Sequence, residues 1–550
     1  MSDATVSSAP KHRTAIFLAS FLTLIAAGMG FAIRGGALAQ WAETFGFTKT
    51  ELGIITGGGL WFFGVVIMAA SLITDRLGYK SILMLAFAAH VVSALITVAA
   101  TPVYEHFGQQ ATFWCLNLGM WLFAIGNGLC EAVINPLVAT LYPRRKTHYL
   151  NILHAGWPAG MILGAVMALM FQGEEASVAS LRWEIPMLFY LVPTLIYGVI
   201  AFKEHFPISE ARAAGITFGR MLVEFASPLL LFLLLLQACV GYVELGTDSW
   251  IASITNEITK VASEDGKGQG MYLFIWASSI MFVLRFFAGP IVEKINPLGL
   301  LFVSACLGCL GLLLIGWNAV QGAAENVVMA TWAAVTIYAL GKTFFWPTML
   351  GVVGERFPKG GALTMGAVGG IGMLSAGLLG GPGIGYKQDY FASQYLDKTL
   401  AASDTYERYA AGKQNRFLFF PAIRGLDGSK VAVLRDPEGP GTELERSVVL
   451  LEEQGRTNKD IAQLARWWET AEEHAESDEP PVAESVNYGG GMALIYTAAV
   501  PAFMAFGYLI LVIYFRAKGG YKQVHIDGTD PVTKDHGEEY TGGVEAPVQA

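Results

Sequence analysis

Apolar residues in this chain gather into twelve runs, each long enough to cross the hydrocarbon core of a membrane. A transmembrane helix needs about 20 predominantly apolar residues. Of the 550 residues, 53% are hydrophobic and only 15% are charged, whereas soluble proteins carry about 25% charged residues. The pattern therefore predicts an all-α protein that crosses a membrane many times. The approximate limits of the runs are 14–40, 51–74, 81–101, 112–141, 149–171, 184–203, 226–250, 271–292, 298–318, 327–354, 362–385 and 491–516.

Lysine and arginine are concentrated in alternate loops between these runs. Arg76 and Lys80 follow the second run, and Arg144, Arg145 and Lys146 follow the fourth, whereas the loops on the other side hold few cations. Because loops rich in cations stay in the cytoplasm, both termini are predicted to be cytoplasmic, as an even number of spans requires. The sequence thus predicts an integral protein of the inner or plasma membrane.

A hydrophilic linker at residues 204–225 divides the runs into two sets of six. Asp75-Arg76 after the second run is echoed by Glu293-Lys294 after the eighth. Two six-helix pseudo-repeat bundles with solute held between them are typical of secondary transporters. The predicted segments are a tail (1–13), an N-terminal bundle (14–203), the linker (204–225), helices 7–11 of a C-terminal bundle (226–386), an insert (387–490), helix 12 (491–516) and a second tail (517–550).

The insert is the longest polar segment, and by the order of the loops it lies outside the cytoplasm. Residues 443–476 show apolar side chains at near-helical spacing, which predicts a helix. The Ser-Asp-Glu-Pro-Pro stretch at 477–481 is expected to end that helix. These features predict a small cap or docking subdomain that binds a protein partner, with a poorly ordered insert as the alternative.

Other classes of function lack their motifs in this sequence. The five cysteines fall inside apolar runs, and no set of histidines and cysteines has metal-ligand spacing. The glycine-rich stretch at 366–385 is not followed by the Lys-Ser/Thr of a phosphate loop, so its small residues are expected to let helices pack closely. The net charge of −9 does not suggest nucleic-acid binding. We therefore expect no enzyme, no cofactor and no metal, and any active transport must use an ion gradient.

Glu131 is the first candidate functional residue, because it interrupts a long apolar run. It lies ten residues before the end of the run at Leu141, roughly 15 Å along a helix and close to the membrane midplane. A charged side chain there costs about 2.5–3.5 kcal/mol, so it usually faces a bundle interior or an aqueous path. Asn127, Glu131 and Asn135 recur every four residues and form one polar stripe.

Removal from water favours the protonated form of a carboxylic acid. Glu131 can therefore be neutral when loaded and ionised when it faces solvent, which predicts a proton-coupling role. The alternative is a permanently protonated glutamate that only hydrogen-bonds a neighbouring helix.

The seventh run carries a second polar stripe. Gln237, Gly241, Glu244 and Asp248 recur at intervals of four, three and four. Polar groups repeated on one helix face indicate that this face lines a cavity. Gln237 and the more deeply placed Glu244 are therefore candidates for binding the solute.

Three further candidates lie on the fifth and tenth runs. His154 lies three residues from Asn151 on the same helix face, and an imidazole titrates near neutral pH. On the tenth run, Lys342 and Trp346 are four residues apart and could supply a charge partner and a stacking surface for a sugar ring. The alternatives are a histidine that only satisfies a hydrogen bond and a tryptophan that only packs.

Residues 71–80, Ser-Leu-Ile-Thr-Asp-Arg-Leu-Gly-Tyr-Lys, resemble the loop signature of the major facilitator superfamily, with Ser71 where glycine is usual. Gly78 permits a tight turn, and Asp75 can pair with a cation or a helix N-terminus in one conformer and release it in the other. We therefore expect a conformational latch formed by Asp75, Arg76 and Lys80, with Arg285 of the eighth run also setting the equilibrium. The alternative is a solvated turn that only reflects topology.

Within that superfamily the chain resembles the fucose:proton symporter family of sugar permeases. Residues 126–136, Gly-Asn-Gly-Leu-Cys-Glu-Ala-Val-Ile-Asn-Pro, resemble the fourth-helix motif of that family, and Tyr-Leu-Asn-Ile-Leu-His at 149–154 follows at nearly the family spacing. Weaker matches are Arg-Phe-Phe-Ala-Gly at 285–289 and Phe-Trp-Pro-Thr at 345–348. The resemblance covers residues 15–386 and 491–516. It implies the major facilitator fold, proton-coupled sugar transport and a proton-coupling role for Glu131.

Two positions depart from that family. Its first-helix aspartate falls at Gly35, next to Arg34, and a fifth-helix asparagine that contacts sugar falls at Trp157. Arg34 has three possible roles: it could pair with Glu131, bind an anionic group of the solute, or extend to the membrane interface.

The sequence therefore predicts a proton-coupled symporter of a sugar or related polyhydroxy solute, whose partners are the solute, H⁺ and the lipid bilayer. The alternatives are an organic or inorganic anion transporter that uses Arg34, and a solute sensor that signals through the insert. The predicted solute-binding residues are Asn135, Asn151, His154, Arg34, Gln237, Glu244 and Trp346.

Overall fold

The computed structural model describes residues 9–45, 47, 49–172, 177–179, 181–261, 268–322, 326–436, 439–453, 459–524 and 526. Residues 1–8 and 527–550 of the predicted tails lie outside the described residues, as do 437–438 and 454–458 of the insert. The described part is helical apart from its loops and two isolated β-bridges in the insert. This confirms the all-α fold class.

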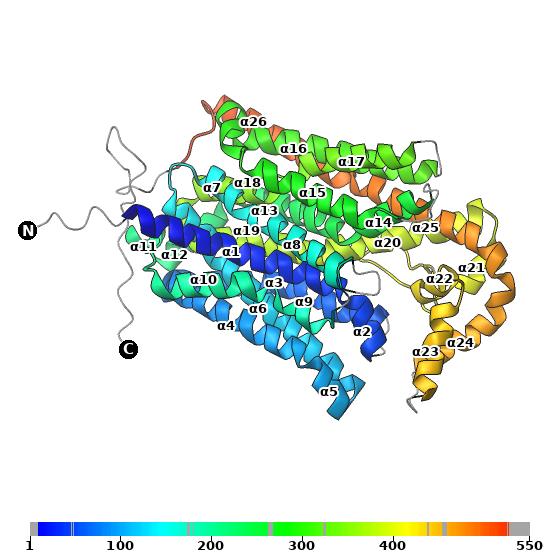
Figure 1. Ribbon diagram of the computed structural model, residues 1–550. Helices are drawn as coiled ribbons and strands as arrows, with labels where there is room; N and C mark the ends of the chain where they lie inside the picture. The colour runs from blue at the N-terminus through cyan, green and yellow to red at the C-terminus, as the bar shows by residue number, and fades with distance from the viewer. Residues whose placement is uncertain are drawn as a thin grey trace, which may run out of the picture.

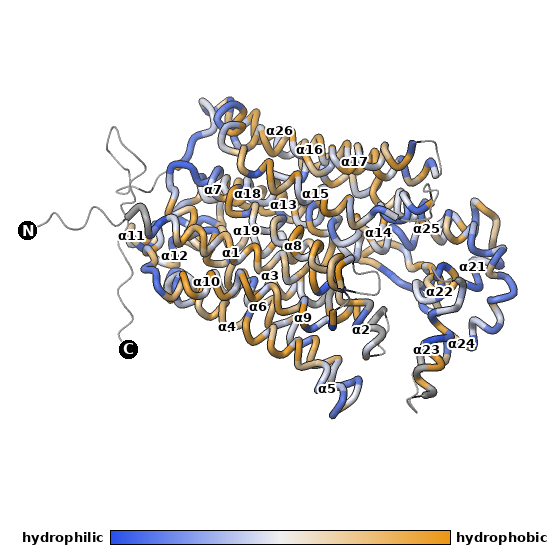
Figure 2. Tube along the Cα trace, in the orientation of Figure 1, coloured by the Kyte–Doolittle hydropathy of each residue, from blue (hydrophilic) through white to orange (hydrophobic). Residues whose placement is uncertain are grey.

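The helices form an elongated bundle (Figure 1). We call the end where α1 begins and α26 finishes the terminal end, and the opposite end, which carries α21–α24, the insert end. Hydrophobic residues follow the length of the bundle, whereas hydrophilic residues collect at its ends and in the insert (Figure 2). This distribution is that of a protein whose middle faces lipid.

The first six predicted spans correspond to helices α1 to α10. Two of these spans are built from two helices in line: α7 and α8 for the fifth span, and α9 and α10 for the sixth. The bounds are α1 Ala9–Gly36, α2 Leu38–Phe45, α3 Lys49–Leu77, α4 Tyr79–Val98, α5 Ala100–Phe107, α6 Gln109–Leu141, α7 Lys146–His154, α8 Gly156–Phe171, α9 Glu184–Leu188 and α10 Leu191–Lys203.

The linker forms the short helices α11 (Glu210–Ala213) and α12 (Phe218–Val223), and the second half follows. Its bounds are α13 Pro228–Gly241, α14 Thr247–Val261, α15 Gly270–Arg285, α16 Ala288–Gln321, α17 Val327–Lys342, α18 Phe345–Arg356, α19 Gly361–Ser375, α20 Gly381–Gln394, α25 Ala475–Thr497 and α26 Ala499–Ala517. Single π-helical turns join α13 to α14 (Tyr242–Gly246) and α19 to α20 (Ala376–Gly380).

Within the described residues, eleven helices are long and apolar enough to cross a membrane. The eighth predicted run is the exception, because α15 has only 16 residues and the chain turns at Phe286 and Phe287 before α16 begins. A left-handed Asn296 before Pro297 then divides α16 into two helical parts. The chain is therefore a multi-pass membrane protein, and the count of twelve spans stays a prediction.

Small residues let the two halves approach closely along α3 and α19. A Cβ at Gly64 would lie 2.9 Å from the carbonyl oxygen of Gly370, and one at Gly366 would lie 1.8 Å from the hydroxyl of Ser71. Helices in lipid associate through such close packing, because lipid itself supplies no hydrophobic drive between them. The expectation that the glycine-rich stretch serves packing is confirmed here.

The insert is folded, with its own apolar core, and the alternative of a poorly ordered segment is wrong for its described residues. Leu396, Tyr409, Leu434, Trp468 and Val482 meet in this core. Its helices are α21 Ser403–Tyr409, α22 Gly428–Leu434, α23 Thr442–Glu453 and α24 Lys459–Ala471. Residues 443–476 therefore contain α23, α24, a 3-10 turn at Glu472–His474 and the start of α25, so the predicted single helix is wrong.

The boundaries of the insert also differ from the prediction. Helix continues through 386–387 as far as Thr399, and α25 begins at Ala475 and runs through 490–491. The Pro480-Pro481 pair therefore lies inside α25, as its sixth and seventh residues, and does not end a helix. Asp478 accepts two hydrogen bonds from Arg408, at 2.6 and 2.8 Å, and these bonds raise the pKa of the guanidinium. Two helices thus continue past the predicted ends of their spans and carry the subdomain.

Candidate functional site

The structure joins Glu131, Asn135 and His154 in one chain of hydrogen bonds. Asn135 Nδ2 donates to Glu131 Oε2 at 2.6 Å, and Asn135 Oδ1 lies 2.9 Å from His154 Nε2. All three side chains are buried. Among the ion pairs of the described residues, none involves Glu131, so this carboxylate has an amide and no cation as its side-chain partner.

Asn127 belongs to a different cluster, although it lies one turn from Glu131. Its Oδ1 contacts His90 Nε2 at 2.9 Å, and His90 Nδ1 contacts the Tyr197 hydroxyl at 2.9 Å. The predicted single polar stripe is therefore split: Asn127 contacts His90 of α4, whereas Asn135 contacts His154 of α7 and Glu131 contacts Asn135. A spacing of four residues turns by about 40° per step, which is enough over eight residues to reach different neighbours.

Arg34 lies inside the N-terminal half. It donates to the Gly30 carbonyl and to Ser93 Oγ, both at 3.1 Å, and its guanidinium lies 3.9 Å from the centroid of Phe123. Only 2% of the residue is exposed, which excludes extension to the membrane interface in this conformation. Its contacts are with α1, α4, α6 and Tyr190, in the turn before α10, and Glu131 is not among them.

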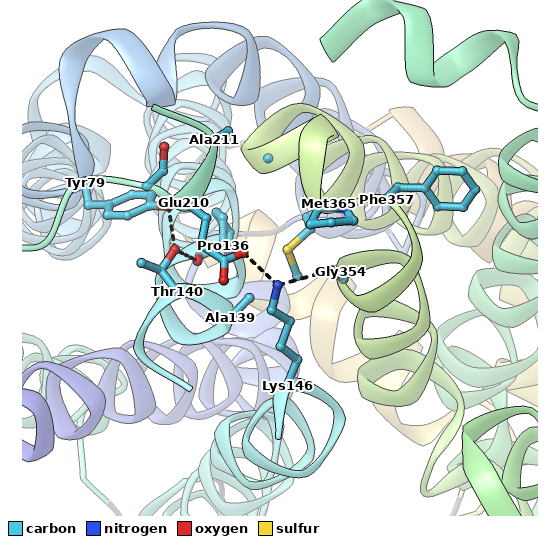
Figure 3. A pocket seen from close by; sticks show the side chains of 13 residues that line it. Tyr79, Pro136, Ala139, Thr140, Lys146, Glu210, Ala211, Gly354, Phe357 and Met365 are labelled. Atoms are coloured by element: carbon cyan, nitrogen blue, oxygen red, sulfur yellow. Dashed lines mark hydrogen bonds and ion pairs between the residues drawn. The ribbon is translucent and has the colours of Figure 1, made fainter. Parts of the chain in front are cut away.

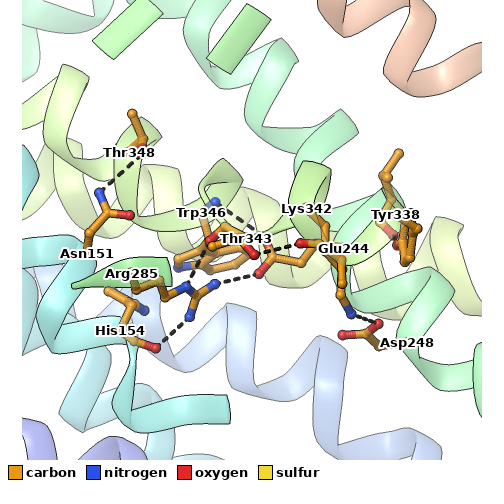
Figure 4. A network of polar contacts seen from close by, with 12 residues as sticks. Asn151, His154, Glu244, Asp248, Arg285, Tyr338, Lys342, Thr343, Trp346 and Thr348 are labelled. Carbon is orange, nitrogen blue, oxygen red and sulfur yellow. Dashed lines mark hydrogen bonds and ion pairs between the residues drawn. The ribbon is translucent and has the colours of Figure 1, made fainter. Parts of the chain in front are cut away.

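A second set of charges lies in the C-terminal half (Figure 4), with Glu244, Arg285 and Lys342 buried and Asp248 half-buried. Glu244 Oε1 accepts from Arg285 Nη2 at 3.0 Å, and its Oε2 accepts from the backbone N–H of Trp346 at 3.2 Å. Lys342 forms an ion pair with Asp248. This set contains two cations and two carboxylates, all paired.

Arg285 connects this set to the N-terminal half. Its Nη1 donates to the carbonyl oxygen of His154 at 2.5 Å, and its Nε donates to the carbonyl oxygen of Thr343 at 2.8 Å. A continuous polar path thus runs from Glu131 through Asn135, His154 and Arg285 to Glu244. It crosses from one half of the bundle to the other.

Gln237 and Asn151 have polar atoms without partners. Gln237 is fully buried, and neither its Oε1 nor its Nε2 has a hydrogen-bond partner among the described residues. Asn151 donates to Thr348 Oγ1 at 3.2 Å, but its Oδ1 has no partner in the same part of the chain. A Cβ at Gly372 would lie 2.8 Å from Gln237 Nε2 and 2.6 Å from the Trp346 ring, so these two side chains are neighbours. Buried polar atoms without partners are costly, which is a sign of a binding site.

The predicted latch residues lie at the terminal end, apart from Arg285. Asp75 Oδ2 accepts from the backbone N–H of Ala362 at 3.4 Å, at the start of α19. Lys80 donates to the carbonyls of Phe202 and Glu204 at the end of α10, and Arg76 lies over the ring of Phe218 in the linker. Asp75 thus pairs with a helix N-terminus of the opposite half, while the two cations contact their own half and the linker.

A small pocket at the same end lies between the two halves and the linker (Figure 3). Lys146 in its wall donates to Glu210 of the linker at 2.7 Å and to the carbonyl of Gly354 at 3.3 Å. Next to it, Thr147 donates to Glu355 at 2.6 Å. Sequence reasoning missed these contacts, although the Arg144–Lys146 cluster marked the loop. The two halves therefore touch at the terminal end.

Comparison with known proteins identifies the fold. The sequence profile of the Major Facilitator Superfamily matches residues 20–381. The proton:xylose symporter XylE, bound to a bromodeoxyglucose, aligns with a TM-score of 0.58 at 15% identity, over 76% of this chain and 97% of that chain. The fucose:proton symporter FucP of E. coli aligns with a TM-score of 0.52 at 16% identity, over 70% and 93%.

A bacterial homolog of the human lysosomal transporter Spinster aligns with a TM-score of 0.55 at 15% identity, over 91% of this chain and 98% of that chain. At these identities the likeness concerns the fold alone. No curated protein matches the sequence.

Proposed function

The chain belongs to the Major Facilitator Superfamily, and we propose that it is a secondary active transporter, not an enzyme, that moves a neutral sugar or related polyhydroxy solute together with protons. Transport proceeds by alternating access between the two halves. In this proposal both termini are cytoplasmic, and an inward proton gradient drives uptake. The sugar and fucose symporters of the same fold are consistent with this class of solute.

The observation that carries the proposal is the buried position of Glu131 without a cation. A buried carboxylate is costly when ionised and uncompensated, so this group favours a bound proton while it is enclosed and releases it when solvent reaches it. Asn135 and His154 connect Glu131 to the interface between the halves. Loading of the proton and movement of the halves can therefore influence each other.

The solute site of the proposal lies around Gln237, Trp346 and Asn151. The amide of Gln237 and the Oδ1 of Asn151 offer unused donors and acceptors, which suit hydroxyl groups. The ring of Trp346 beside Gln237 offers an aromatic surface for the apolar face of a sugar ring. An amide and an aromatic surface together fit a polyhydroxy solute better than a purely apolar one.

Charge balance supports a neutral solute over an anion. Glu244 pairs with Arg285, and Asp248 pairs with Lys342, so this region adds no net charge to the path. Arg34, on which the anion alternative depends, points into the N-terminal half toward Ser93 and Phe123. The two cations near Gln237 in the described part of the chain, Arg285 and Lys342, are thus both paired.

Uptake into proteoliposomes tests the proposal. The purified full chain is reconstituted, an inward proton gradient is imposed, and a panel of neutral sugars and small organic acids is offered. Accumulation of a neutral sugar that a protonophore abolishes is the expected result. Uptake restricted to acids, or neutral-sugar accumulation that does not respond to the protonophore, would contradict it. Arg34→Gln is the control for the anion alternative. If the protein transports an acid through Arg34, this change should abolish uptake of the acid; if it transports a sugar, the change should leave sugar uptake intact.

A further inference from the structure

Two helices, one from each half, contain a Trp-Pro pair at the same place. Trp157-Pro158 opens α8, and Trp346-Pro347 opens α18; in both cases proline is the third residue of the second helix in a two-part span. Proline has no backbone N–H and cannot donate to the carbonyl four residues before it. The carbonyls that lose their helical partner are those of His154 and Thr343.

Both of these carbonyls accept a hydrogen bond from Arg285. Nη1 donates to His154 at 2.5 Å and Nε donates to Thr343 at 2.8 Å, while Nη2 donates to Glu244 at 3.0 Å (Figure 4). All three nitrogens of the guanidinium are used, and the planar fork of arginine is the side chain that can serve three acceptors in fixed directions. Arg285 is 1% exposed, so water does not compete for these bonds.

At the break between α17 and α18, the backbone hydrogen-bonds to both members of the Arg285–Glu244 ion pair. The carbonyl oxygen of Thr343, at the C-terminal end of α17, accepts a hydrogen bond from Arg285. The backbone N–H of Trp346, near the N-terminal end of α18, donates one to Glu244. A helix carries partial negative charge at its C-terminus and partial positive charge at its N-terminus, so each end faces the charge that it stabilises. Glu244 and the broken helix therefore hold Arg285 in place from the C-terminal half.

We propose that Arg285 is a positioning residue that clamps the two halves together through the proline-freed carbonyl of His154, and that release of this bond accompanies the opening of the terminal end. The bond to His154 is the only one of the three that crosses between the halves. His154 lies in the same span as Asn151 and Thr147, which contact Thr348 and Glu355 of the other half, respectively. The clamp deepens the proposed transport function, on which its role in the cycle rests.

Pro158→Ala tests the clamp without altering any polar side chain. It restores an N–H that can donate to the His154 carbonyl, which then competes with Arg285. The readout is the distance distribution between spin labels at exposed Lys203 and Lys518, which end α10 and α26 at the terminal end, in the full chain with its five cysteines replaced. We expect the ratio of long to short distances to rise on the order of tenfold, the effect of losing one charged hydrogen bond.

Pro193→Ala is the matched control, since Pro193 is the third residue of α10 and its region makes no contact with Arg285. It should leave the distribution unchanged. Arg285→Gln should produce the shift seen with Pro158→Ala, and the double variant should shift no further than Arg285→Gln alone. If Arg285→Gln does not assemble, Pro158→Ala still decides the matter.

An unchanged distribution in Pro158→Ala would overturn the clamp. A shift of equal size in the wild-type and Arg285→Gln backgrounds would also overturn it, because the proline would then act through helix stiffness alone. The measurement uses no solute, so its result is independent of whether the transported solute is a sugar. Failure of the clamp and failure of the proposed solute class are therefore distinguishable.

Discussion

Helix α6 in the N-terminal half and the α17–α18 pair in the C-terminal half place a charged residue five positions before a proline, but they use it differently. In α6, Glu131 precedes Pro136 in a continuous helix, and among the described residues its side chain hydrogen-bonds only to Asn135 of the same helix. In α17–α18, Lys342 precedes Pro347, the helix is broken between them, and every charge nearby is paired.

This difference suggests that the two halves have different roles in transport. A carboxylate without a cation can gain and lose a proton at little cost to the surrounding contacts, whereas paired charges fixed by helix ends resist change. Under the proposed function, the N-terminal half holds the group suited to proton coupling, and the paired charges of the C-terminal half form a fixed frame around Arg285.

The largest expected effect comes from breaking the buried ion pair between Glu244 and Arg285. Glu244→Gln leaves Arg285 buried without a counter-charge, which costs about 3–5 kcal/mol of folding free energy when a buried pair is broken. Denaturant titration of the purified protein measures this loss. Glu131→Gln is the matched comparison, because it removes a carboxylate that has no cation, and it should change stability by less than about 1 kcal/mol. Equal losses in the two variants would remove the distinction between the halves.

The next effect concerns coupling. With one proton per solute, a gradient of one pH unit supports about tenfold accumulation, since one unit corresponds to about 1.36 kcal/mol. Glu131→Gln should reduce accumulation to equilibrium while solute exchange across the membrane continues. Glu184→Gln, a carboxylate-to-amide change at the insert end beside Arg182, serves as the control. If Glu131→Gln accumulates solute like the unaltered protein, the proton assignment is wrong.

A smaller effect with opposite signs is expected at Gln237. Gln237→Leu removes two buried polar atoms that have no partner, which should stabilise the empty protein by about 1 kcal/mol. The same change removes hydrogen bonds to the solute, so solute affinity should fall by about tenfold. Unfolding of the solute-free protein and equilibrium binding measure the two effects. A loss of stability would show that Gln237 serves the fold and not the solute.

The smallest effect is expected from the insert. Its core is separate from the cores of the bundle, so replacement of residues 400–474 by a short linker should leave proton-driven accumulation unchanged. Uptake by the shortened protein measures this. Loss of transport would instead make the insert part of the transport path. Intact uptake with loss of a cellular response to the solute would favour the sensor alternative.

The sequence alone determined the class of fold, because apolar runs of this length can satisfy their backbone only as membrane helices. It also indicated Glu131, Gln237 and Glu244 as unusual residues, since a polar group in an apolar run is costly wherever it faces. The insert boundaries were less predictable, because helices continue from the membrane into a polar segment and local composition cannot show where the bilayer ends.

Only the tertiary structure decided which of these residues are partners. Arg34 and Glu131 were both plausible members of one site, yet Arg34 turns toward Ser93 and Phe123 of its own half. Arg285, expected with the latch, instead joins His154, Thr343 and Glu244. Prolines 158 and 347 were visible in the sequence as helix breakers, but their freed carbonyls meet one guanidinium only because two distant spans cross at that point. Such pairings depend on helix rotation and crossing, which residue spacing along one helix does not determine.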